Sequence, residues 1–401
     1  MGIPRLRLMK RILNTDPIPN LPTVGIIGGG QLALMLVRAA SQLGLHARVI
    51  DASPICPARR DAADFCEGNP ESPATLDRFA MNLEVVTLEN EFLDAALIAG
   101  LEAEGQEVLP SSRTMSLVQD KLAQKQTLRN AAVSVVDFEP VNDGTPIQEL
   151  ESLFGLPFVL KKRCHGYDGT GNFTVHRAEE WDAALNKLGG RESGLYAERW
   201  CPFERELAVI VTRSKKGEHV LYPVVETRQR NHVCEQVIAP AAVSGSIAEQ
   251  AAHLALKAIE AVDGVGSFGV EFFLLADGTL LVNEIAPRVH NSGHYTIEAC
   301  ECSQFENHIR AICGLPLGST KLRQPAAMVN LLGKTTAAGA PRGLAEALAV
   351  SGAHVHLYGK HHAKRGRKMG HVTALGSTSD EALATAQCAA DFIHFDQPNL
   401  I

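Results

Sequence analysis

Two acidic residues on a predicted β-hairpin carry the strongest chemical signal in the sequence. Residues 269–275 and 280–284 alternate as two strands, and Asp277-Gly278 is typical of a two-residue turn between them. This register places Glu271 directly opposite Glu284. Opposed side chains of an antiparallel pair have Cβ atoms roughly 4.5–5.5 Å apart, where like charges repel each other.

The neighbours of the acidic pair are apolar, so the pair does not belong to a solvated acidic surface. The same register pairs Phe273 with Val282. A positive group is therefore expected between the carboxylates, and Mg²⁺ fits because it takes one or two carboxylates and completes its shell with water and phosphate. The alternatives are a shared proton, or one carboxylate turned towards an arginine such as Arg288.

A basic strand end followed by a glycine-rich loop indicates phosphate binding. Lys161-Lys162-Arg163 ends a predicted strand, and the loop of residues 165–171 contains three glycines. Adjacent strand residues point to opposite faces, so one of the two lysines faces the ligand. Ammonium groups and backbone N–H groups both bind phosphate oxygens. The alternative is an exposed basic strand with an ordinary turn.

Residues 283–294 combine a strand end bearing Glu284 with a loop of hydrogen-bond donors. Arg288, His290, Asn291 and Ser292 are side chains that can stabilise an oxyanion. A single histidine is more often structural, but this cluster adjoins the acidic pair. The sequence therefore predicts a wall of an active site here.

Two further segments could bind anions. Gly28-Gly29-Gly30 precedes a predicted helix, and Asp51 follows about 20 residues later, as in dinucleotide-binding folds. The segment could also bind another phosphorylated ligand, or none. Residues 360–368 are rich in lysine and arginine. They could bind a phosphorylated substrate or form a solvated run of charge.

The elements that position these residues begin with a β-α-β pattern. Strands are expected at 24–27, 47–50 and 84–88, with a helix at 31–43. This pattern implies a parallel sheet with helices on both faces.

A second unit begins with a polar helix, and a third begins near residue 324 with short strands. The expected elements of the second unit are a helix at 119–129, strands at 158–162, 195–198 and 206–212, the hairpin, and helices at 247–262 and 305–313.

The composition is that of an ordinary globular protein of several domains. The 401 residues are 45% hydrophobic and 21% charged, with a net charge of −7. This charge gives no general attraction to nucleic acid or to anionic membranes, and no apolar run reaches the ~18 residues of a membrane span.

The nine scattered cysteines favour reduced thiols in a reducing compartment, so a cytoplasmic location is expected. Residues 1–20 are expected to be a disordered leader, although a transit peptide or a later start at Met9 is also possible.

These motifs together resemble the ATP-grasp superfamily and, within it, the 5-(carboxyamino)imidazole ribonucleotide synthase family of purine biosynthesis. The resemblance extends from Val24 to His371. Its most specific segments are GIIGGGQL, GYDGTGN, ERWCPFERELAVIVTR, VNEIAPRVHNSGH and GRKMGH.

The resemblance implies an α/β, multidomain (α+β) chain of three units. Residues 21–115 would form a Rossmann-like domain, 116–320 a two-lobed ATP-grasp domain, and 321–401 a small β-rich C-terminal domain. The implied cofactors are ATP and Mg²⁺, the implied substrates are 5-aminoimidazole ribonucleotide and bicarbonate, and the implied assembly is a homodimer. No nucleic-acid or membrane partner is implied.

The resemblance also assigns residues around ATP and the metal. Glu271 and Glu284 would hold Mg²⁺, beside Asn283. Glu198 to Cys201 would bind adenine through their backbone, and Glu206 would bind the ribose. The full set of implied ATP-binding residues is Lys121, Lys161, His165, Gly166, Tyr167, Asp168, Gly169, Thr170, Gly171, Glu198, Arg199, Trp200, Cys201, Glu206, Gln229, Asn283 and Glu284.

A further set is assigned to the other substrates. Arg288 would stabilise the migrating phosphoryl group, while His290, Asn291 and Ser292 would hold carboxyphosphate and the amine. The residues assigned to the ribonucleotide are Gly30, Gln31, Leu32, Glu89, Glu91, Tyr167, Arg288, His290, Lys360 and Arg367.

Three positions depart from the family pattern. Thr170 stands where a basic residue is usual, Gln229 where histidine is frequent, and Lys121 where arginine is common. Lysine keeps the charge of arginine but loses its two-pronged hydrogen bonding.

Other functions compatible with the sequence are another ATP-grasp carboxylate–amine ligase, an NAD-dependent oxidoreductase, or an inactive nucleotide-binding protein. The oxidoreductase hypothesis leaves Glu271 and Glu284 without a role.

Overall fold

The N-terminal unit is a parallel sheet, as predicted, in a computed structural model that describes residues 21–142, 144–164, 166 and 171–396. The strand order is β3-β2-β1-β4. The strand predicted at 84–88 is the fourth rather than the third, because the short edge strand β3 precedes it. The elements are β1 (Thr23–Ile27), α1 (Gln31–Gln42), β2 (His46–Asp51), η1 (Pro57–Arg60), β3 (Asp64–Glu67), α2 (Pro73–Ala80), β4 (Val85–Leu88), α3 (Ala95–Ala103) and α4 (Ser112–Gln119).

Both faces of this sheet are covered, and every residue of β1 is buried. Val24 and Ile26 pack on the side of α1, and Ile27 packs with residues of α2 and α3 on the other side. This follows from the two-residue period of a strand. The outer side of α1 is covered in turn by α10 (Gln304–Ile312) of the central unit, which leaves most of α1 buried.

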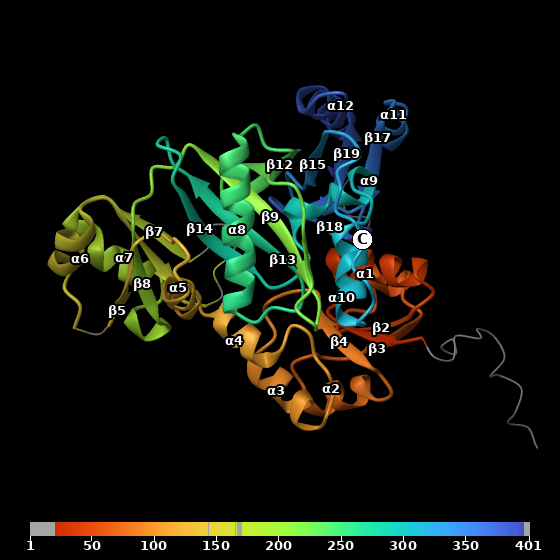
Figure 1. Cartoon of the computed structure of the whole chain (residues 1–401), viewed down its shortest axis with the longest axis horizontal. Helices are drawn as coiled ribbons and strands as arrows, with labels where there is room; N and C mark the ends of the chain where they lie inside the picture. Colours follow the sequence, from red (N-terminus) through yellow and green to blue (C-terminus); the bar gives the residue numbers. More distant parts are fainter. Residues whose placement is uncertain (1–20, 143, 165, 167–170, 397–401) are drawn as a thin grey trace, which may run out of the picture.

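The smaller lobe of the central unit is a four-stranded antiparallel sheet of order β5-β8-β6-β7. It lies to one side of the main sheet in Figure 1. The helix predicted at 119–129 corresponds to α5, which is separated from α4 by Asp120. The Asp120 side chain caps α5 by accepting hydrogen bonds from the Leu122 and Ala123 N–H groups. The elements are α5 (Lys121–Asn130), β5 (Phe138–Val141), α6 (Ile147–Phe154), β6 (Phe158–Lys162), β7 (Asn172–Val175), α7 (Trp181–Lys187) and β8 (Leu195–Arg199).

A single nine-stranded sheet contains the larger lobe and the C-terminal strands. Its order is β14-β13-β9-β11-β12-β15-β19-β17, with β10 paired to β9. Ala239 of β12 pairs with Ala326 of β15 across the junction. The sequence predicted short C-terminal strands, but not that they would extend the ATP-grasp sheet.

Helix α8 packs on the β9, β13 and β14 part of this sheet, and α12 packs on β15 and β19 (Figure 1). The elements are β9 (Arg205–Arg213), β10 (His219–Leu221), β11 (Val225–Arg230), β12 (Val233–Ala239), α8 (Gly245–Ala261), β13 (Gly266–Leu274), β14 (Leu280–Ala286), η4 (Asn291–Gly293), α9 (Thr296–Ala299), β15 (Ala326–Leu332), β16 (Ala337–Ala338), α11 (Leu344–Leu348), β17 (Ala353–Leu357), β18 (His362–Ala363), β19 (Lys368–Leu375) and α12 (Ser379–Phe392). None of the helices in the described ranges is long and apolar enough to cross a membrane.

The turn between β13 and β14 differs from the prediction. The Gly278 N–H donates to the Leu275 carbonyl at 3.0 Å, and the Leu275 N–H donates to the Thr279 carbonyl at 2.9 Å. The turn therefore has three residues, and Gly278 ends it with a φ of +86° that favours glycine. The predicted two-residue turn was wrong.

The acidic pair is nevertheless aligned as predicted. Phe273 pairs with Leu281 rather than with Val282, but the register shifts by one residue between Glu271 and Phe272. This bulge offsets the additional turn residue, so Glu271 lies opposite Glu284.

His308 connects the N-terminal sheet to the large sheet. Its Nδ1 accepts from the Ser267 N–H at 3.0 Å, so Nε2 carries the proton and donates to Thr87 Oγ1 at 2.8 Å. Burial lowers the pKa of His308 to about 4, which keeps the ring neutral at pH 7. A buried neutral histidine thus fixes β4 against β13.

Replacing His308 with alanine is expected to lower the free energy of unfolding by about 2–4 kcal/mol, because it leaves a cavity and an unpaired Ser267 N–H. The Thr87→Val variant removes one hydrogen-bond partner and should cost about 1–2 kcal/mol. Urea unfolding at pH 7 measures both. A negligible loss in His308→Ala would contradict the connecting role.

Candidate active site

Each carboxylate of the acidic pair has a different neighbour. Lys121 Nζ is 2.6 Å from Glu284 Oε1, and His290 Nε2 is 3.5 Å from Glu271 Oε1. The alternative in which one of these carboxylates turns towards Arg288 is wrong, because Arg288 pairs with Glu91. Burial, the charge of Glu284 and the charge of Glu206 raise the pKa of Glu271 to about 8.

A third carboxylate adds to the negative charge of the cleft. Glu206 lies on β9, in the strand next to β13, and burial raises its pKa to about 7. Within the described residues, no three His, Cys, Asp or Glu side chains are grouped so that they could hold a metal ion. Two carboxylates held face to face do suit Mg²⁺, which takes its remaining ligands from water and phosphate.

Two lysines meet at one buried glutamate in the smaller lobe. Lys161 Nζ is 2.5 Å from Glu198 Oε2, and Lys125 Nζ is 2.7 Å from Glu198 Oε1. Lys125 was not among the predicted site residues. Its position four residues after Lys121 on α5, hence on the same helical face, was the signal that could have revealed it.

The base of the glycine-rich loop is tied to its surroundings by the backbone. The Lys162 N–H donates to the Gly171 carbonyl at 2.9 Å, and the Lys121 N–H donates to the Arg163 carbonyl at 2.8 Å. Gly166 lies in the wall of a cavity beside Lys121. The other predicted loop residues lie outside the described residues: His165, Tyr167, Asp168, Gly169 and Thr170.

The predicted adenine hinge begins with the last two residues of β8, Glu198 and Arg199, and continues beyond the strand. The Arg199 side chain turns away from the cleft to Asp137 and to the carbonyls of α6, while Trp200 is 44% exposed. Cys201 is half-buried. Gln229 is exposed on β11.

Arg288 and Glu91 form a two-pronged ion pair between the central and N-terminal units. Arg288 Nη2 is 2.9 Å from Glu91 Oε1, and Nε contacts the other oxygen. Burial acts to raise the pKa of Glu91, but the Arg288 charge outweighs it and lowers the pKa to about 2. The sequence predicted both residues for the substrate site, but not that they would pair.

The loop after β14 is fixed by side-chain hydrogen bonds. His290 Nδ1 is 2.8 Å from Ser292 Oγ, and burial together with the Arg288 charge lowers the pKa of His290 to about 3. Asn291 forms two amide hydrogen bonds with Asn330 of β15, at 3.0 and 2.6 Å. Asn330 was not predicted, because it lies in an apolar strand far away in the sequence.

The glycine loop before α1 is occupied by carboxylates of the protein. The Gly29 N–H donates to Asp51 at 2.7 Å, and Glu89 accepts from the Ala33 N–H at 3.4 Å. A Cβ at Gly30 would lie 2.5 Å from Glu89 Oε1, so a larger residue there would displace this carboxylate. The structure therefore disfavours the oxidoreductase hypothesis, since Asp51 binds the loop itself. The neighbouring Gln31 and Leu32 begin α1.

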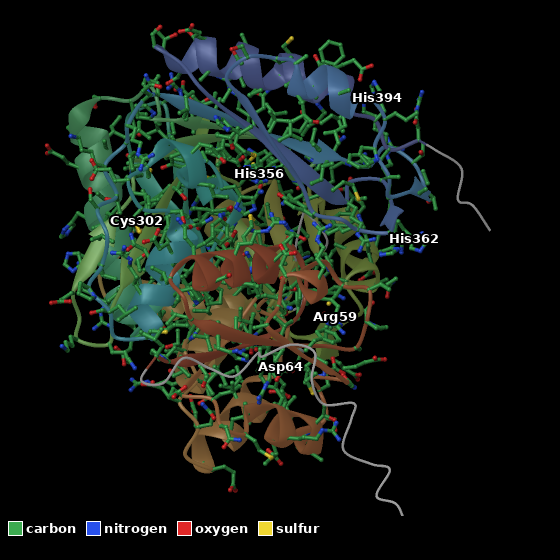
Figure 2. The ribbon with its side chains drawn as sticks, turned by 90° about the vertical axis from the view of Figure 1, so that its right-hand side faces the viewer. Arg59, Asp64, Cys302, His356, His362 and His394 are labelled. Atoms are coloured by element: carbon green, nitrogen blue, oxygen red, sulfur yellow. The ribbon has the colours of Figure 1, made fainter. Side chains whose placement is uncertain are left out.

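The basic C-terminal segment reaches the N-terminal unit. A Cβ at Gly359 would lie 3.2 Å from Arg60, and the C-terminal strands lie directly above the N-terminal unit in Figure 2. Lys360 Nζ donates to the Lys368 carbonyl at 2.8 Å. Burial and the Arg367 charge lower the pKa of Lys360 to about 8. Arg367 is exposed and donates to the His362 carbonyl at 2.7 Å.

A cavity of about 270 Å³ lies between the N-terminal and central units. Lys121, Cys164 and Pro287 line it from the central unit, and Glu91 and Phe92 line it from the N-terminal unit. Lys121, which pairs with Glu284, and Glu91, which pairs with Arg288, thus line the same cavity. This is the arrangement expected where two substrates meet.

Comparisons with known proteins agree with this architecture. Family models match in chain order: a ribonucleotide synthetase preATP-grasp domain over residues 21–119, an ATP-grasp domain over 126–305, and a phosphoribosylaminoimidazole carboxylase C-terminal domain over 326–385. The N5-carboxyaminoimidazole ribonucleotide synthase of Synechococcus elongatus is 40% identical over 96% of this chain and 98% of its own length.

The chain belongs to the N5-carboxyaminoimidazole ribonucleotide synthase family.

Relatives in this family include longer proteins. The chain is 42% identical to the phosphoribosylaminoimidazole carboxylase of Ogataea methanolica, over 89% of this chain, and spans 67% of the length of that protein. The Thermotoga maritima synthetase structure has a TM-score of 0.85 at 38% identity and covers 94% of this chain and 100% of its own. The Aspergillus clavatus synthase in complex with ADP and 5-aminoimidazole ribonucleotide has a TM-score of 0.85 at 38% identity and covers 93% and 98%.

The Glu271→Gln variant tests the crowding of the acidic pair without nucleotide or metal. A glutamate whose pKa rises from 4.5 to about 8 on folding binds more protons in the folded state. It therefore reduces stability as pH rises through this window. Glu271→Gln should have a Tm advantage over the native chain that grows from pH 5.5 to pH 8.5, reaching at least about 2 °C.

The exposed Glu249 on α8 provides the matched control for this series. Glu249→Gln should change Tm by the same small amount at every pH. A Glu271→Gln advantage that does not change with pH would show that the two carboxylates do not repel each other in the folded protein.

Proposed function

We propose that the chain carboxylates 5-aminoimidazole ribonucleotide with bicarbonate, at the expense of ATP, to give N5-carboxyaminoimidazole ribonucleotide, ADP and phosphate. The proposal rests on the cavity that Lys121 and Glu91 both line. Lys121 pairs with Glu284 of the acidic pair, and Glu91 pairs with Arg288. The similar Aspergillus clavatus structure contains ADP and 5-aminoimidazole ribonucleotide. We also propose that the boundaries between the three units lie at residues 115 and 320.

In the first step, an oxygen of bicarbonate attacks the γ-phosphorus of ATP, and the bond to the β-phosphate oxygen breaks to give carboxyphosphate and ADP. The reaction depends mainly on positioning and on charge neutralisation. Lys121 and Lys161 are the ammonium groups of the cleft that supply positive charge to the phosphates. The loop of residues 165–171 is proposed, from the family resemblance, to exclude water.

A divalent magnesium ion fits the two carboxylates that the β13–β14 hairpin holds opposite each other. Glu271 and Glu284 would hold it, with Asn283 beside them. When bound, it would neutralise charge on the ATP phosphates. Glu206 and the backbone of residues 198–201 are proposed to bind the ribose and adenine.

In the second step, the exocyclic amine of the ribonucleotide attacks the carboxyl carbon, the carbon–oxygen bond to phosphate breaks, and the amine loses a proton. Arg288 is positioned by Glu91 to bind the anionic intermediate. His290 is neutral, because burial and Arg288 lower its pKa to about 3, so it acts as a hydrogen-bonding group rather than as a cation. Asn291 and Ser292 are proposed to complete this wall.

The ribonucleotide is proposed to lie between the N-terminal and C-terminal units. Glu89 and the first residues of α1, Gly30 to Leu32, would contact it from one side, and Lys360 and Arg367 would bind its phosphate from the other. Tyr167 is assigned to the same pocket by the family resemblance. The homodimer and the cytoplasmic location stay predictions.

A coupled ADP-release assay tests the function. ADP formation should require Mg²⁺, be stimulated by bicarbonate, and rise further with 5-aminoimidazole ribonucleotide. Glu284→Gln should lower kcat by at least about 100-fold with little change in Tm, because it removes a carboxylate proposed to hold Mg²⁺. No response to the ribonucleotide would favour another ATP-grasp ligase, and a normal rate in Glu284→Gln would remove this residue from the site.

Lys360 gives a prediction for pH dependence. Because its pKa is lowered to about 8, the ammonium loses its proton as pH rises above that value. The KM for the ribonucleotide should therefore rise above pH 8, while the KM for ATP stays constant. Lys360→Arg, which stays charged, should remove this dependence. Lys360→Met should raise the ribonucleotide KM about 10-fold or more at pH 7, and equal changes in both KM values would contradict the assignment.

A further inference from the structure

Glu198 has more positive charge around it than it needs for neutrality. Its two carboxylate oxygens each contact a different ammonium group, Lys125 at 2.7 Å and Lys161 at 2.5 Å. The side chains of Glu198 and Lys125 are only 3% exposed, whereas that of Lys161 is 17% exposed. Lys125 is thus enclosed, whereas Lys161 is partly open to solvent.

Helix α5 holds Lys125 in a fixed position between the lobes. Lys121, one turn earlier on the same face, contacts Glu284 of the large sheet at 2.6 Å, while Lys125 contacts Glu198 of the smaller sheet. Gln124, between them, accepts from the Ile285 N–H at 3.0 Å and anchors the helix to β14. The helix therefore presents one lysine to a carboxylate of each lobe.

A buried carboxylate that loses its only cation is strongly destabilised. If Lys161 moves from Glu198 to a phosphate oxygen, Glu198 needs another partner to stay neutralised. Lys125 is already in place for this, and it is too enclosed to reach the cleft itself. One ammonium group can then bind nucleotide while the other stays.

We propose that Lys125 is a positioning residue for ATP binding, which neutralises Glu198 and thereby leaves Lys161 available to a phosphate of the nucleotide. This inference depends on the proposed ATP site. It assigns Lys125 a role that acts through Glu198 and not by contact with substrate.

The proposal predicts a specific relation between two substitutions. In Lys125→Met, Glu198 retains Lys161 as its only cation, so ATP affinity should fall about 10- to 100-fold. In Glu198→Gln, no buried carboxylate competes for Lys161, so ATP should bind at least as tightly as to the native chain. In the double variant Lys125→Met/Glu198→Gln, affinity should return to within about threefold of the Glu198→Gln value.

Direct titration of MgATP by calorimetry, with the full chain, measures these affinities without requiring turnover. Lys215→Met is the matched control, since it removes a lysine that pairs with Glu107 at 2.8 Å on the surface. It should leave ATP affinity unchanged. Tm values measured in parallel report the structural cost of each substitution.

The outcomes separate this inference from the proposed function. Failure of the native chain to bind MgATP would overturn both. If the native chain binds MgATP normally, two results would overturn only the role of Lys125. One is that Lys125→Met binds ATP as tightly as the native chain. The other is that the double variant binds it at least 10-fold more weakly than Glu198→Gln. If Lys125→Met does not fold, a double variant at least 10-fold weaker than Glu198→Gln still overturns the proposal, because such a loss of affinity could not act through Glu198.

Discussion

The repulsion between Glu271 and Glu284 is the constraint around which the rest of the cleft is arranged. Like charges directly opposite each other across an antiparallel pair are destabilising. The bulge in the hairpin holds them opposite each other, and Lys121 and His290 lie beside them. Burial and this repulsion raise the pKa of Glu271 to about 8. Such a site is strained without a cation and suited to hold one beside nucleotide phosphates.

Positive charge is distributed over the surrounding elements rather than concentrated in one motif. Helix α5 supplies Lys121 and Lys125, β6 supplies Lys161, and the loop after β14 supplies Arg288. Each of these cations has a carboxylate partner in the structure. Binding of an anionic substrate therefore exchanges partners within an existing network, and the energetic cost of each exchange depends on which carboxylate is left behind.

The continuous nine-stranded sheet explains how the C-terminal unit takes part in the site. Because β15 pairs directly with β12, the segment around Lys360 has a fixed place against the N-terminal unit. Asn330 of β15 also holds Asn291 of the loop after β14. The N-terminal, central and C-terminal units thus share one polar centre, although the acidic pair belongs to the central unit alone.

The sequence by itself determined the elements and the motifs, because strand alternation, glycine-rich loops and helical periodicity are local properties. It fixed the parallel N-terminal sheet, the position of α8, and the pairing of Glu271 with Glu284, although the last prediction was right only because an unforeseen three-residue turn is offset by an unforeseen bulge. Only the tertiary structure decided which charges meet: Arg288 with Glu91, Glu89 over the loop before α1, and Lys125 with Glu198. These contacts join residues far apart in the chain, and their pairing depends on how the sheets pack, which no local pattern encodes.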